Sequence, residues 1–210
     1  YRESIKTVLR PVKHKLMDLS AHLLHYLPRE EKVFFTETPG PKVLFVANGH
    51  IPTLQLSFLT PLKTYVDQGS LQYATLYDAE VSNFYKTGSK DFQKLLLKTA
   101  PDIVVFCRYS GPYSEDLMSY CKQKNIKTAY HIDDDLLNVP KEIGERKYKF
   151  HNDPKRRGSI DYLLKSVDLI YCSTEKLMER LKSYDYNTPM TSGAIYCAGK
   201  ILSAPATSSN

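Results

Sequence analysis

The feature that most constrains the fold is a repeated alternation of short apolar runs with helical patterns. From residue 42 onward, runs of β-branched and aromatic residues alternate with amphipathic segments of about ten to fifteen residues. Units of this length form right-handed crossovers between parallel strands, with helices on both faces of the sheet. The pattern predicts a doubly wound, mainly parallel α/β sheet of the Rossmann-like class. Its expected strands are 43–47, 71–77, 102–107, 127–132 and 167–172.

The helical segments carry their own start and stop signals. Pro61 should kink or split the first of them, because proline lacks a backbone N–H. Ser114 is expected to cap the third helix, and Ser173 or Thr174 the last. The stretch 136–158 has no clear period and is expected to be irregular. The expected helices are 52–67, 89–100, 113–125, 159–166 and 174–184.

Three segments flank the predicted domain, which spans residues 42–200. Apolar residues at steps of three and four predict an amphipathic helix over 1–27, with basic residues mostly off its apolar stripe. Residues 28–41 are polar and rich in proline and are interpreted as a linker, and 201–210 as a second linker or a tail. The chain starts at Tyr1 without an apolar signal-peptide core, so we expect a cytoplasmic protein that is part of a longer one.

Composition narrows the possible partners. The net charge of +6 suggests an anionic partner, such as a phosphorylated ligand or an acidic membrane surface. Basic residues gather in the first fifteen positions and again over 144–158. No helix-turn-helix, zinc or RNP-type signature accompanies them, which argues against nucleic acid. The four cysteines form no Cys-x-x-Cys pair, which favours reduced thiols over disulfides or zinc.

Several nucleotide and hydrolase motifs are missing. A single glycine follows the first strand, in place of the G-x-G-x-x-G of dinucleotide-binding domains. The chain also has no G-x-x-x-x-G-K-[ST] and no G-x-S-x-G. The domain is therefore expected to bind a polar ligand without a glycine-rich nucleotide clamp.

Ligands of open parallel sheets bind beyond the carboxyl ends of the strands. Each expected strand of this chain is followed there by polar residues, which together should form one wall of a cleft. The residues expected to contact the ligand are Asn48, Gly49, His50, Arg108, Tyr109, Asp134 and Ser173.

The strand 127–132 ends in three consecutive aspartates, Asp133, Asp134 and Asp135. Asp-x-Asp spacing can hold a divalent cation. A phosphotransfer pocket would need a further aspartate and a lysine at other strand ends, which are absent. The carboxylates can also serve as a base or bind the hydroxyls of a sugar. The simplest alternative is a solvated loop with one capping aspartate, and the residues alone leave these four interpretations open.

The runs "KVLFVANGH", "PDIVVFCRYSG", "AYHIDDDLLNVP" and "VDLIYCSTEKLMERL" together resemble the N-terminal half of GT-B glycosyltransferases. The chain is most similar to bacterial enzymes that build surface polysaccharides. In that architecture the N-terminal Rossmann-like domain mainly binds the acceptor, and a C-terminal domain binds the nucleotide-sugar. The resemblance covers residues 42 to 200.

The resemblance implies a transferase that moves a sugar from a nucleotide-sugar to a glycan or lipid-linked acceptor. It implies no metal and no cofactor, since GT-B enzymes generally work without a bound divalent ion. Asp133 and Asp135, which share a side by alternation from Ile132, become the candidate catalytic carboxylates, and the strand-end residues become acceptor contacts.

A donor-binding domain further along the parent chain would be the partner, so this chain alone is expected to be inactive. The cytoplasmic membrane face is a further expected partner, and a non-catalytic Rossmann-like binding or scaffold module is the alternative function.

Overall fold

The computed structural model describes residues 39–87, 96 and 99–193, which form an α/β domain around one six-stranded sheet. The chain divides into two units, Tyr1–Val33 and Phe34–Asn210, and every described residue belongs to the second. Several expected segments lie outside the described residues: the helix 1–27, most of the linker 28–41, most of the helix 89–100 and the tail 201–210.

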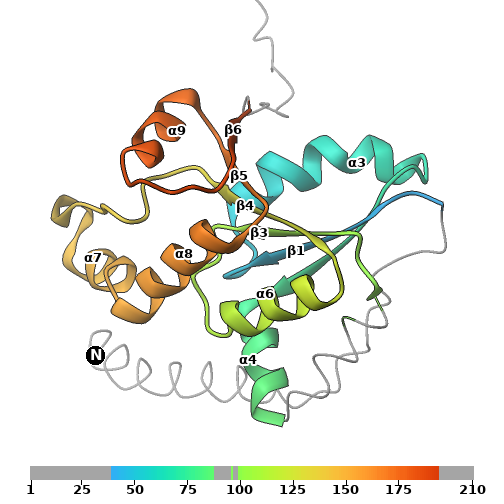
Figure 1. Ribbon diagram of the computed structural model, residues 1–210, viewed down its shortest axis with the longest axis horizontal. Coiled ribbons are helices and arrows are strands. Elements are labelled where there is room, and N and C mark those ends of the chain that lie inside the picture. The colour runs from blue at the N-terminus through green and yellow to red at the C-terminus, as the bar shows by residue number, and fades with distance from the viewer. Residues whose placement is uncertain (1–38, 88–95, 97–98, 194–210) are drawn as a thin grey trace, which may run out of the picture. The chain divides into compact units, whose positions relative to one another are not determined.

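All six strands are parallel and lie in the order β2-β1-β3-β4-β5-β6 (Figure 1). This confirms the predicted doubly wound α/β class, and the five expected strands are present to within two residues. The sixth strand, β6, was not predicted, because three residues are too short to show an alternation pattern. The strands are β1 Lys42–Ala47, β2 Gln72–Tyr77, β3 Ile103–Cys107, β4 Lys127–Ile132, β5 Leu169–Cys172 and β6 Met190–Ser192.

The strand order places the topological switch between β1 and β3. From β1 the chain moves outward to β2, then crosses β1 to reach β3 and continues in the opposite direction to β6. The connections that leave β1 and β3 therefore run to opposite sides, and a crevice opens at the carboxyl ends of these two strands.

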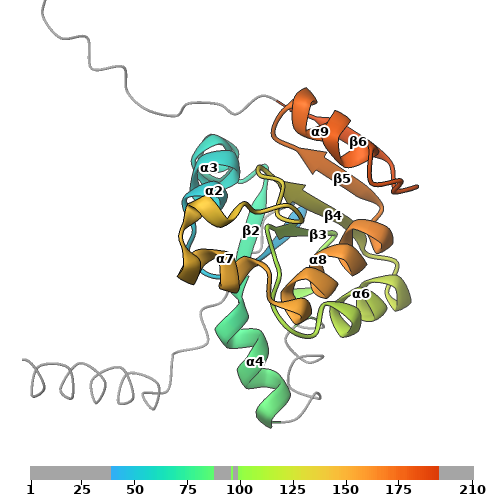
Figure 2. The same cartoon turned by 90° about the vertical axis from the view of Figure 1, so that its left-hand side faces the viewer.

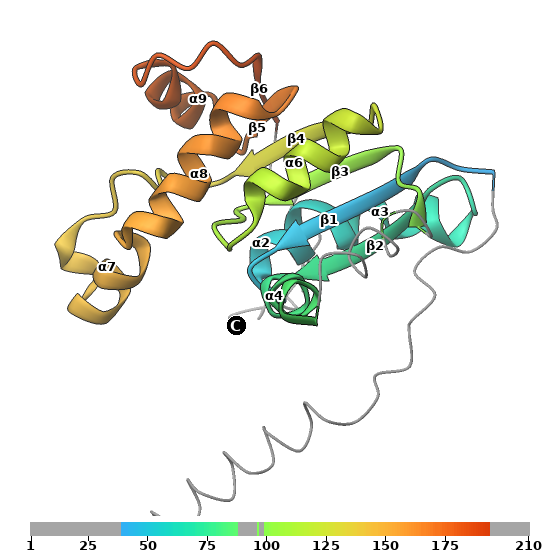
Figure 3. The ribbon, with the colours of Figure 1, turned by 60° about the horizontal axis from the view of Figure 1, so that its bottom comes forward.

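Helices cover both faces of the sheet (Figure 3). One face packs against α4, α6 and α8 through a buried cluster that includes Val81, Leu117 and Leu163. The other face packs against the continuous helix formed by α2, η1 and α3, through Leu54 and Phe58. The helices are α2 Pro52–Leu54, the π-helix η1 Gln55–Leu59, α3 Thr60–Asp67, α4 Asp78–Thr87, α6 Ser114–Gln123, the 3₁₀ helix η2 Lys141–Ile143, α7 Glu145–His151, α8 Pro154–Ser166 and α9 Glu175–Lys182.

The region 136–158 is the main correction to the predicted elements. It was expected to be irregular, but it contains η2, α7 and the first turn of α8. Asp153 caps α8, since its side chain accepts from the backbone N–H groups of Lys155 and Arg156. The helix α4 was also not predicted. Helix α7 and the first turn of α8 lie beside the carboxyl end of the sheet, so this correction bears on the site (Figure 2).

Two expected helix starts have different outcomes. Thr174 is the N-cap of α9, as predicted, and its side chain accepts from Leu177 N at 3.2 Å. Ser114 was expected to cap α6, but the N-cap is Tyr113, in a left-handed conformation with φ 64° and without a side-chain cap bond. Ser114 is instead buried, where it accepts a hydrogen bond from Ser159 Oγ at 3.0 Å.

Pro61 does not split the first helix, which runs without a break from Pro52 to Asp67. The turn before the proline widens to the π-helix Gln55–Leu59, in which Thr60 N bonds to Gln55 O. Proline cannot donate to the carbonyl one turn earlier, and a wider turn accommodates that loss. The expected distortion is therefore present as a π-helical segment.

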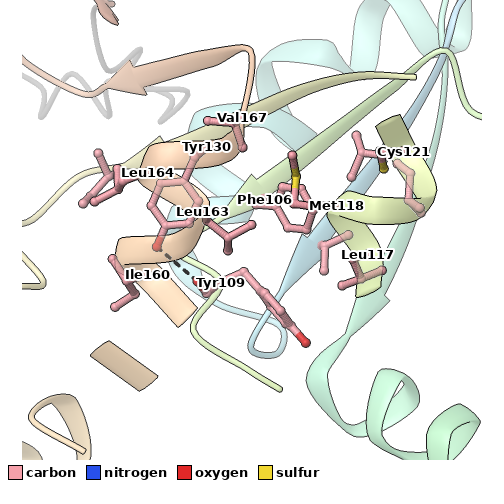
Figure 4. Packing of buried hydrophobic residues seen from close by; sticks show 14 of the residues in the cluster. Phe106, Tyr109, Leu117, Met118, Cys121, Tyr130, Ile160, Leu163, Leu164 and Val167 are labelled. Atoms are coloured by element: carbon pink, nitrogen blue, oxygen red, sulfur yellow. Dashed lines mark hydrogen bonds between the residues drawn. The ribbon is translucent and has the colours of Figure 1, made fainter. Parts of the chain in front are cut away.

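The core on the α6 and α8 side contains two tyrosines whose rings are fully buried (Figure 4). Tyr130 donates its hydroxyl hydrogen to the Tyr109 carbonyl oxygen at 3.1 Å, and Tyr109 donates to the Pro112 carbonyl oxygen at 2.8 Å. Buried hydroxyls need such partners, because an unpaired polar group in the core is costly. This pair of bonds fixes the loop that follows β3 against the core.

Candidate functional site

The side chain of Asn48 joins the two sides of the switch point. Its Nδ2 donates to the Arg108 carbonyl oxygen at 2.9 Å and to Ser110 Oγ at 3.0 Å, and its Oδ1 accepts from Ser110 N at 2.9 Å. The sequence predicted Asn48 as a ligand contact. In the structure both of its polar atoms bond the loop after β3, so the amide holds that loop against the end of β1.

Arg108 follows β3 directly and adopts a left-handed backbone conformation, with φ 51°. Its N–H donates to the His131 carbonyl oxygen at 2.9 Å, while its own carbonyl accepts from Asn48. A residue with a β-carbon pays about 1 kcal/mol or more for this conformation. Arg108 keeps this unfavourable conformation at the mouth of the crevice, which suggests that its guanidinium has a functional role there.

The Arg108 guanidinium lies between two aspartates of the acidic triplet. Its Nη1 is 2.8 Å from Asp133 Oδ1 and 2.8 Å from Asp134 Oδ2. Asp133 also accepts a 2.6 Å hydrogen bond from Thr53 Oγ1, at the start of α2. The ion pair to Asp133 Oδ1 is close in distance but lacks hydrogen-bond alignment. The arrangement therefore combines two carboxylates, one guanidinium and one hydroxyl, which is a suitable set for the hydroxyls of a polyol.

The three aspartates differ in exposure and in partners. The side chains of Asp133 and Asp135 are 18% and 20% exposed, and that of Asp134 is 66% exposed. Asp135 turns toward α9, where its Oδ2 accepts from Arg180 Nε at 3.0 Å and from the Tyr184 hydroxyl at 2.8 Å. The expectation that Asp133 and Asp135 share a side is therefore wrong. The strand ends at Ile132 and the chain turns, so the alternation does not continue into the triplet.

The other residues predicted for the site fall into two groups. Gly49 and His50 lie at the surface after β1, and His50 Nδ1 is 3.4 Å from the Tyr77 hydroxyl. Tyr109 and Ser173 are buried, at 0% and 4% exposure. The Tyr109 side chain belongs to the core, and Ser173 Oγ donates to the Asp133 carbonyl oxygen at 3.4 Å. Burial removes these two side chains from the surface on which a ligand would lie, which corrects the expectation that they contact it.

His131 is buried on the α2–α3 face of the sheet, at 1% exposure. Its Nδ1 lies 3.1 Å from the Tyr171 carbonyl oxygen, and the edge of the Phe58 ring packs against it at a centroid distance of 4.9 Å. Within the described part of the chain, His131 Nε2 has no hydrogen-bond partner. Desolvation lowers the pKa of His131 and outweighs the opposing effect of Asp133. His131 is a neutral core residue.

Beside the switch point a small pocket combines strand-end residues with residues of the basic stretch 144–158. Asn48, Arg108 and Ser110 form one side, and His151 and Arg156 close the other. Arg156 Nη1 donates to Ser110 Oγ at 3.0 Å. Leu136 and Ile160 complete the lining. Ser110 belongs to the expected cleft wall after β3, whereas Thr53, His151 and Arg156 were not among the predicted site residues. The only signal for Arg156 was the basic stretch around it, which does not say which of its members turns inward.

In residues 39–87, 96 and 99–193, no group of three or more His, Cys, Asp and Glu residues is placed to hold a metal ion. Within the same ranges, no helix has the length and apolar character needed to cross a bilayer.

Comparison with known proteins gives one distant structural likeness. No protein-family profile matches the sequence, and no curated protein matches it significantly. Among solved structures, the chain is similar to the crystal structure of Glycyrrhiza uralensis UGT73P12 complexed with glycyrrhetinic acid 3-O-monoglucuronide. The TM-score is 0.42 and the sequence identity is 10%. The match covers 76% of this chain and 49% of that one, so the chain spans about half the length of this neighbour. A likeness at this level carries no argument about fold or activity.

Proposed function

We propose that this chain is the acceptor-binding half of a GT-B glycosyltransferase that moves a sugar from a nucleotide-sugar to a glycan or lipid-linked acceptor in surface polysaccharide synthesis. The observation that carries the proposal is the cluster of Thr53, Arg108, Asp133 and Asp134 at the β1/β3 switch point. Open α/β sheets bind their ligands at this place, and the cluster offers both donors and acceptors to hydroxyl groups. The sequence resemblance to the N-terminal half of GT-B enzymes supports the same function.

In this proposal Asp133 is the carboxylate that meets the attacking hydroxyl. In an inverting transfer it takes the hydroxyl proton as the new glycosidic C–O bond forms. The bond from the anomeric carbon to the donor phosphate breaks at the same time, and the nucleotide leaves with the electron pair. In a retaining transfer the same carboxylate orients the acceptor hydroxyl. Thr53 and Arg108 hold Asp133 in one position, which lowers the entropic cost of aligning it with the acceptor.

Asp135 is the second candidate for this role. Its Oδ2 already accepts bonds from Arg180 and Tyr184, so it would have to exchange partners to reach an acceptor. Asp134, which is 66% exposed, is proposed to bind an acceptor hydroxyl. Asn48 acts through the loop after β3 as a positioning residue, while Gly49 and His50 lie at the open edge of the proposed acceptor site.

The partner in this proposal is a donor-binding domain of the parent chain, which would supply the nucleotide-sugar site. A second partner is the anionic cytoplasmic face of a membrane. Ile143 and Phe150 are 42% and 47% exposed, and they lie on the same short stretch as the exposed Arg146, Lys147 and Lys149. Apolar side chains among basic ones favour binding to anionic lipid headgroups.

The test uses the parent protein with its donor-binding domain. Nucleotide release is measured with UDP-glucose, UDP-galactose and GDP-mannose as donors, in the presence of lipid-linked acceptors. Asp133→Asn is expected to lower kcat about 100-fold or more, as is typical for loss of a general base. Asp134→Asn is expected to raise KM for the acceptor with a smaller change in kcat. Asp116→Asn, an exposed carboxylate on α6, is the matched control and should leave both unchanged. Full activity in all three of Asp133→Asn, Asp134→Asn and Asp135→Asn would contradict the proposal.

A non-catalytic binding or scaffold module is the second candidate, and one observation favours it. Asp133, Asp135 and Asn48 already bond neighbouring elements, so part of the cluster serves to hold the fold together. A module of this kind would bind a glycan without turning over any nucleotide-sugar. Acceptor binding that persists in a parent protein with no transfer activity would support it.

A further inference from the structure

The pocket beside the switch point contains two arginines from segments that are far apart in the sequence. Arg108 comes from the end of β3 and Arg156 from the first turn of α8, and both face the pocket that Asn48 and Ser110 line. The cavity has a volume of about 20 Å³, enough for on the order of one water molecule. The cavity therefore has room for one oxygen atom of a ligand, and the rest of that ligand would lie outside, at the mouth of the pocket.

Arg156 is held in place by contacts that do not neutralise it closely. Its guanidinium lies over the Phe150 ring at 3.9 Å from the centroid, and its Nη1 donates to the neutral hydroxyl of Ser110 at 3.0 Å. The carboxylate paired with it in the described structure, that of Asp78, is 3.9 Å from Nη2, which is beyond hydrogen-bond distance. Stacking on an aromatic ring preorganises the planar guanidinium for a further oxyanion.

Arg108 is neutralised more closely, but one of its two carboxylates can be replaced. The pair with Asp133 is the more buried one, whereas the pair with Asp134 joins a side chain that is 66% exposed. Exposed ion pairs contribute little free energy. An anionic ligand oxygen can therefore take the place of Asp134 at small cost.

The charges of the two arginines also act on His151, which lines the same pocket. Desolvation is the largest cause that lowers its pKa, followed by the charges of Arg108 and Arg156. Asp134 acts in the opposite direction and Lys147 in the same one. The two arginines thus outweigh the nearby carboxylate at the position of His151.

We propose that this pocket is a phosphoryl-binding site, in which Arg108 and Arg156 together bind one oxygen of a phosphate or diphosphate group. The two guanidinium groups give the pocket two positively charged donors for the negatively charged oxygens of a phosphoryl group. Arginine also presents its N–H groups in a planar fork that suits phosphate oxygens. The site stands on its own geometry. Its assignment to a phosphorylated acceptor rests on the proposed function.

The direct test is titration of the full 210-residue chain with inorganic pyrophosphate by calorimetry. Saturable binding with a dissociation constant on the order of 1 mM is expected, which is the scale of a small, open anion site. Arg156→Gln should weaken it about 10-fold or more, because it removes a charged hydrogen-bond donor to the anion. Arg157→Gln is the matched control. It removes the same charge from the neighbouring position of α8, where the side chain is exposed and does not line the pocket.

A second readout locates the anion without relying on any arginine variant. The ring-proton NMR signal of His151, assigned with His151→Gln, should shift on addition of pyrophosphate, and its titration midpoint should rise, because a bound anion stabilises the protonated ring. The signal of His50, an exposed histidine outside the pocket, is the internal control. This measurement remains valid if Arg156→Gln loses stability through its lost contact with Phe150.

Three outcomes would overturn the site: no saturable binding at about ten times the expected dissociation constant, equal weakening by Arg156→Gln and Arg157→Gln, or a His151 signal that does not move. Equal weakening would mean general attraction to a basic surface.

A parallel titration with farnesyl diphosphate distinguishes the two sources of the phosphoryl group. Tighter binding than that of pyrophosphate supports a lipid-linked phosphate, and equal affinity supports a soluble one. If pyrophosphate binds but the parent protein transfers no sugar, the proposed function fails and the site stands. If transfer proceeds without pyrophosphate binding, the site alone is wrong.

Discussion

Asn48 and Ser110 bond each other in both directions across the topological switch: Asn48 Nδ2 donates to Ser110 Oγ at 3.0 Å, and Ser110 N donates to Asn48 Oδ1 at 2.9 Å. A third bond, from Nδ2 to the Arg108 carbonyl oxygen, supports the left-handed conformation of Arg108. One amide thus connects the end of β1 to the loop that carries the guanidinium of the site.

Asn48→Ala should therefore destabilise the domain by about 2–3 kcal/mol, since it removes three hydrogen bonds and leaves their partners unpaired. Urea denaturation followed by circular dichroism measures the change. Asn48→Asp is the informative comparison, because it keeps the acceptor for Ser110 N but loses both donated bonds, and it should fall between the alanine variant and the wild type. A change below about 0.5 kcal/mol in Asn48→Ala would show that the loop is held by other contacts.

His131 should make the domain acid-sensitive. Burial lowers the pKa of His131 in the folded state, so the unfolded chain binds its proton more readily. The stabilisation from the neutral ring is full above the unfolded value of about 6.5. It is lost as the pH falls from there through the folded pKa, at up to about 1.4 kcal/mol per pH unit.

Unfolding free energies measured between about pH 5 and pH 7 test this expectation. His131→Leu should flatten the slope, whatever its effect on absolute stability. A residual slope is expected from His151, whose pKa is also lowered. An unchanged slope in His131→Leu would refute the assignment.

The effects of mutating Asp135 and Tyr184 on the free energy of unfolding should be coupled, whereas those of Asp134 and Tyr184 should be additive. The Tyr184 hydroxyl donates to Asp135 Oδ2 at 2.8 Å, which joins the loop after β4 to the segment after α9. A double-mutant cycle of Asp135→Asn and Tyr184→Phe should give a coupling of about 1 kcal/mol, after allowance for partial exposure. The matched cycle with Asp134→Asn should be additive, because Asp134 contacts Arg108 instead. Equal coupling in the two cycles would contradict the separate directions of the two aspartates.

The buried cysteines should be inert in the folded protein. Cys107, Cys121 and Cys172 are free thiols in the core. Burial raises the pKa of Cys107 and Cys121 to about 12 and that of Cys172 to about 11. The reactive thiolate is therefore scarce at about pH 8. Iodoacetamide labelling followed by peptide mass mapping should leave these three unmodified until the chain is unfolded in guanidinium. Rapid native labelling of any of them would show that the core opens locally around it.

The sheet could be predicted because its evidence is local. Each of the runs that form β1 and β3 is apolar over five consecutive residues, which is typical of strands covered on both faces. The helix 52–67 also followed from its period. The elements that were missed are short or polar. The strand β6 has three residues, and α7 and the first turn of α8 are made largely of charged side chains that show no apolar face.

The site was predictable in place but not in detail. The rule that ligands bind beyond the carboxyl ends of strands selected Arg108 and the aspartate triplet. Side-chain directions within that loop did not follow, because alternation holds only inside a strand and β4 ends at Ile132. Arg156 could not be distinguished from Arg157 by sequence, since both lie in one basic run and only the packing of α8 turns one of them inward.

The sequence by itself determined the class of fold, the order of its main strands along the chain and the edge of the sheet where polar groups gather. These follow from patterns that extend over neighbouring residues. The tertiary structure alone decided the strand order in space, the direction of each aspartate and the meeting of Arg108 with Arg156. These depend on contacts between residues as much as 80 positions apart, such as Thr53 with Asp133, and no local pattern encodes such a contact.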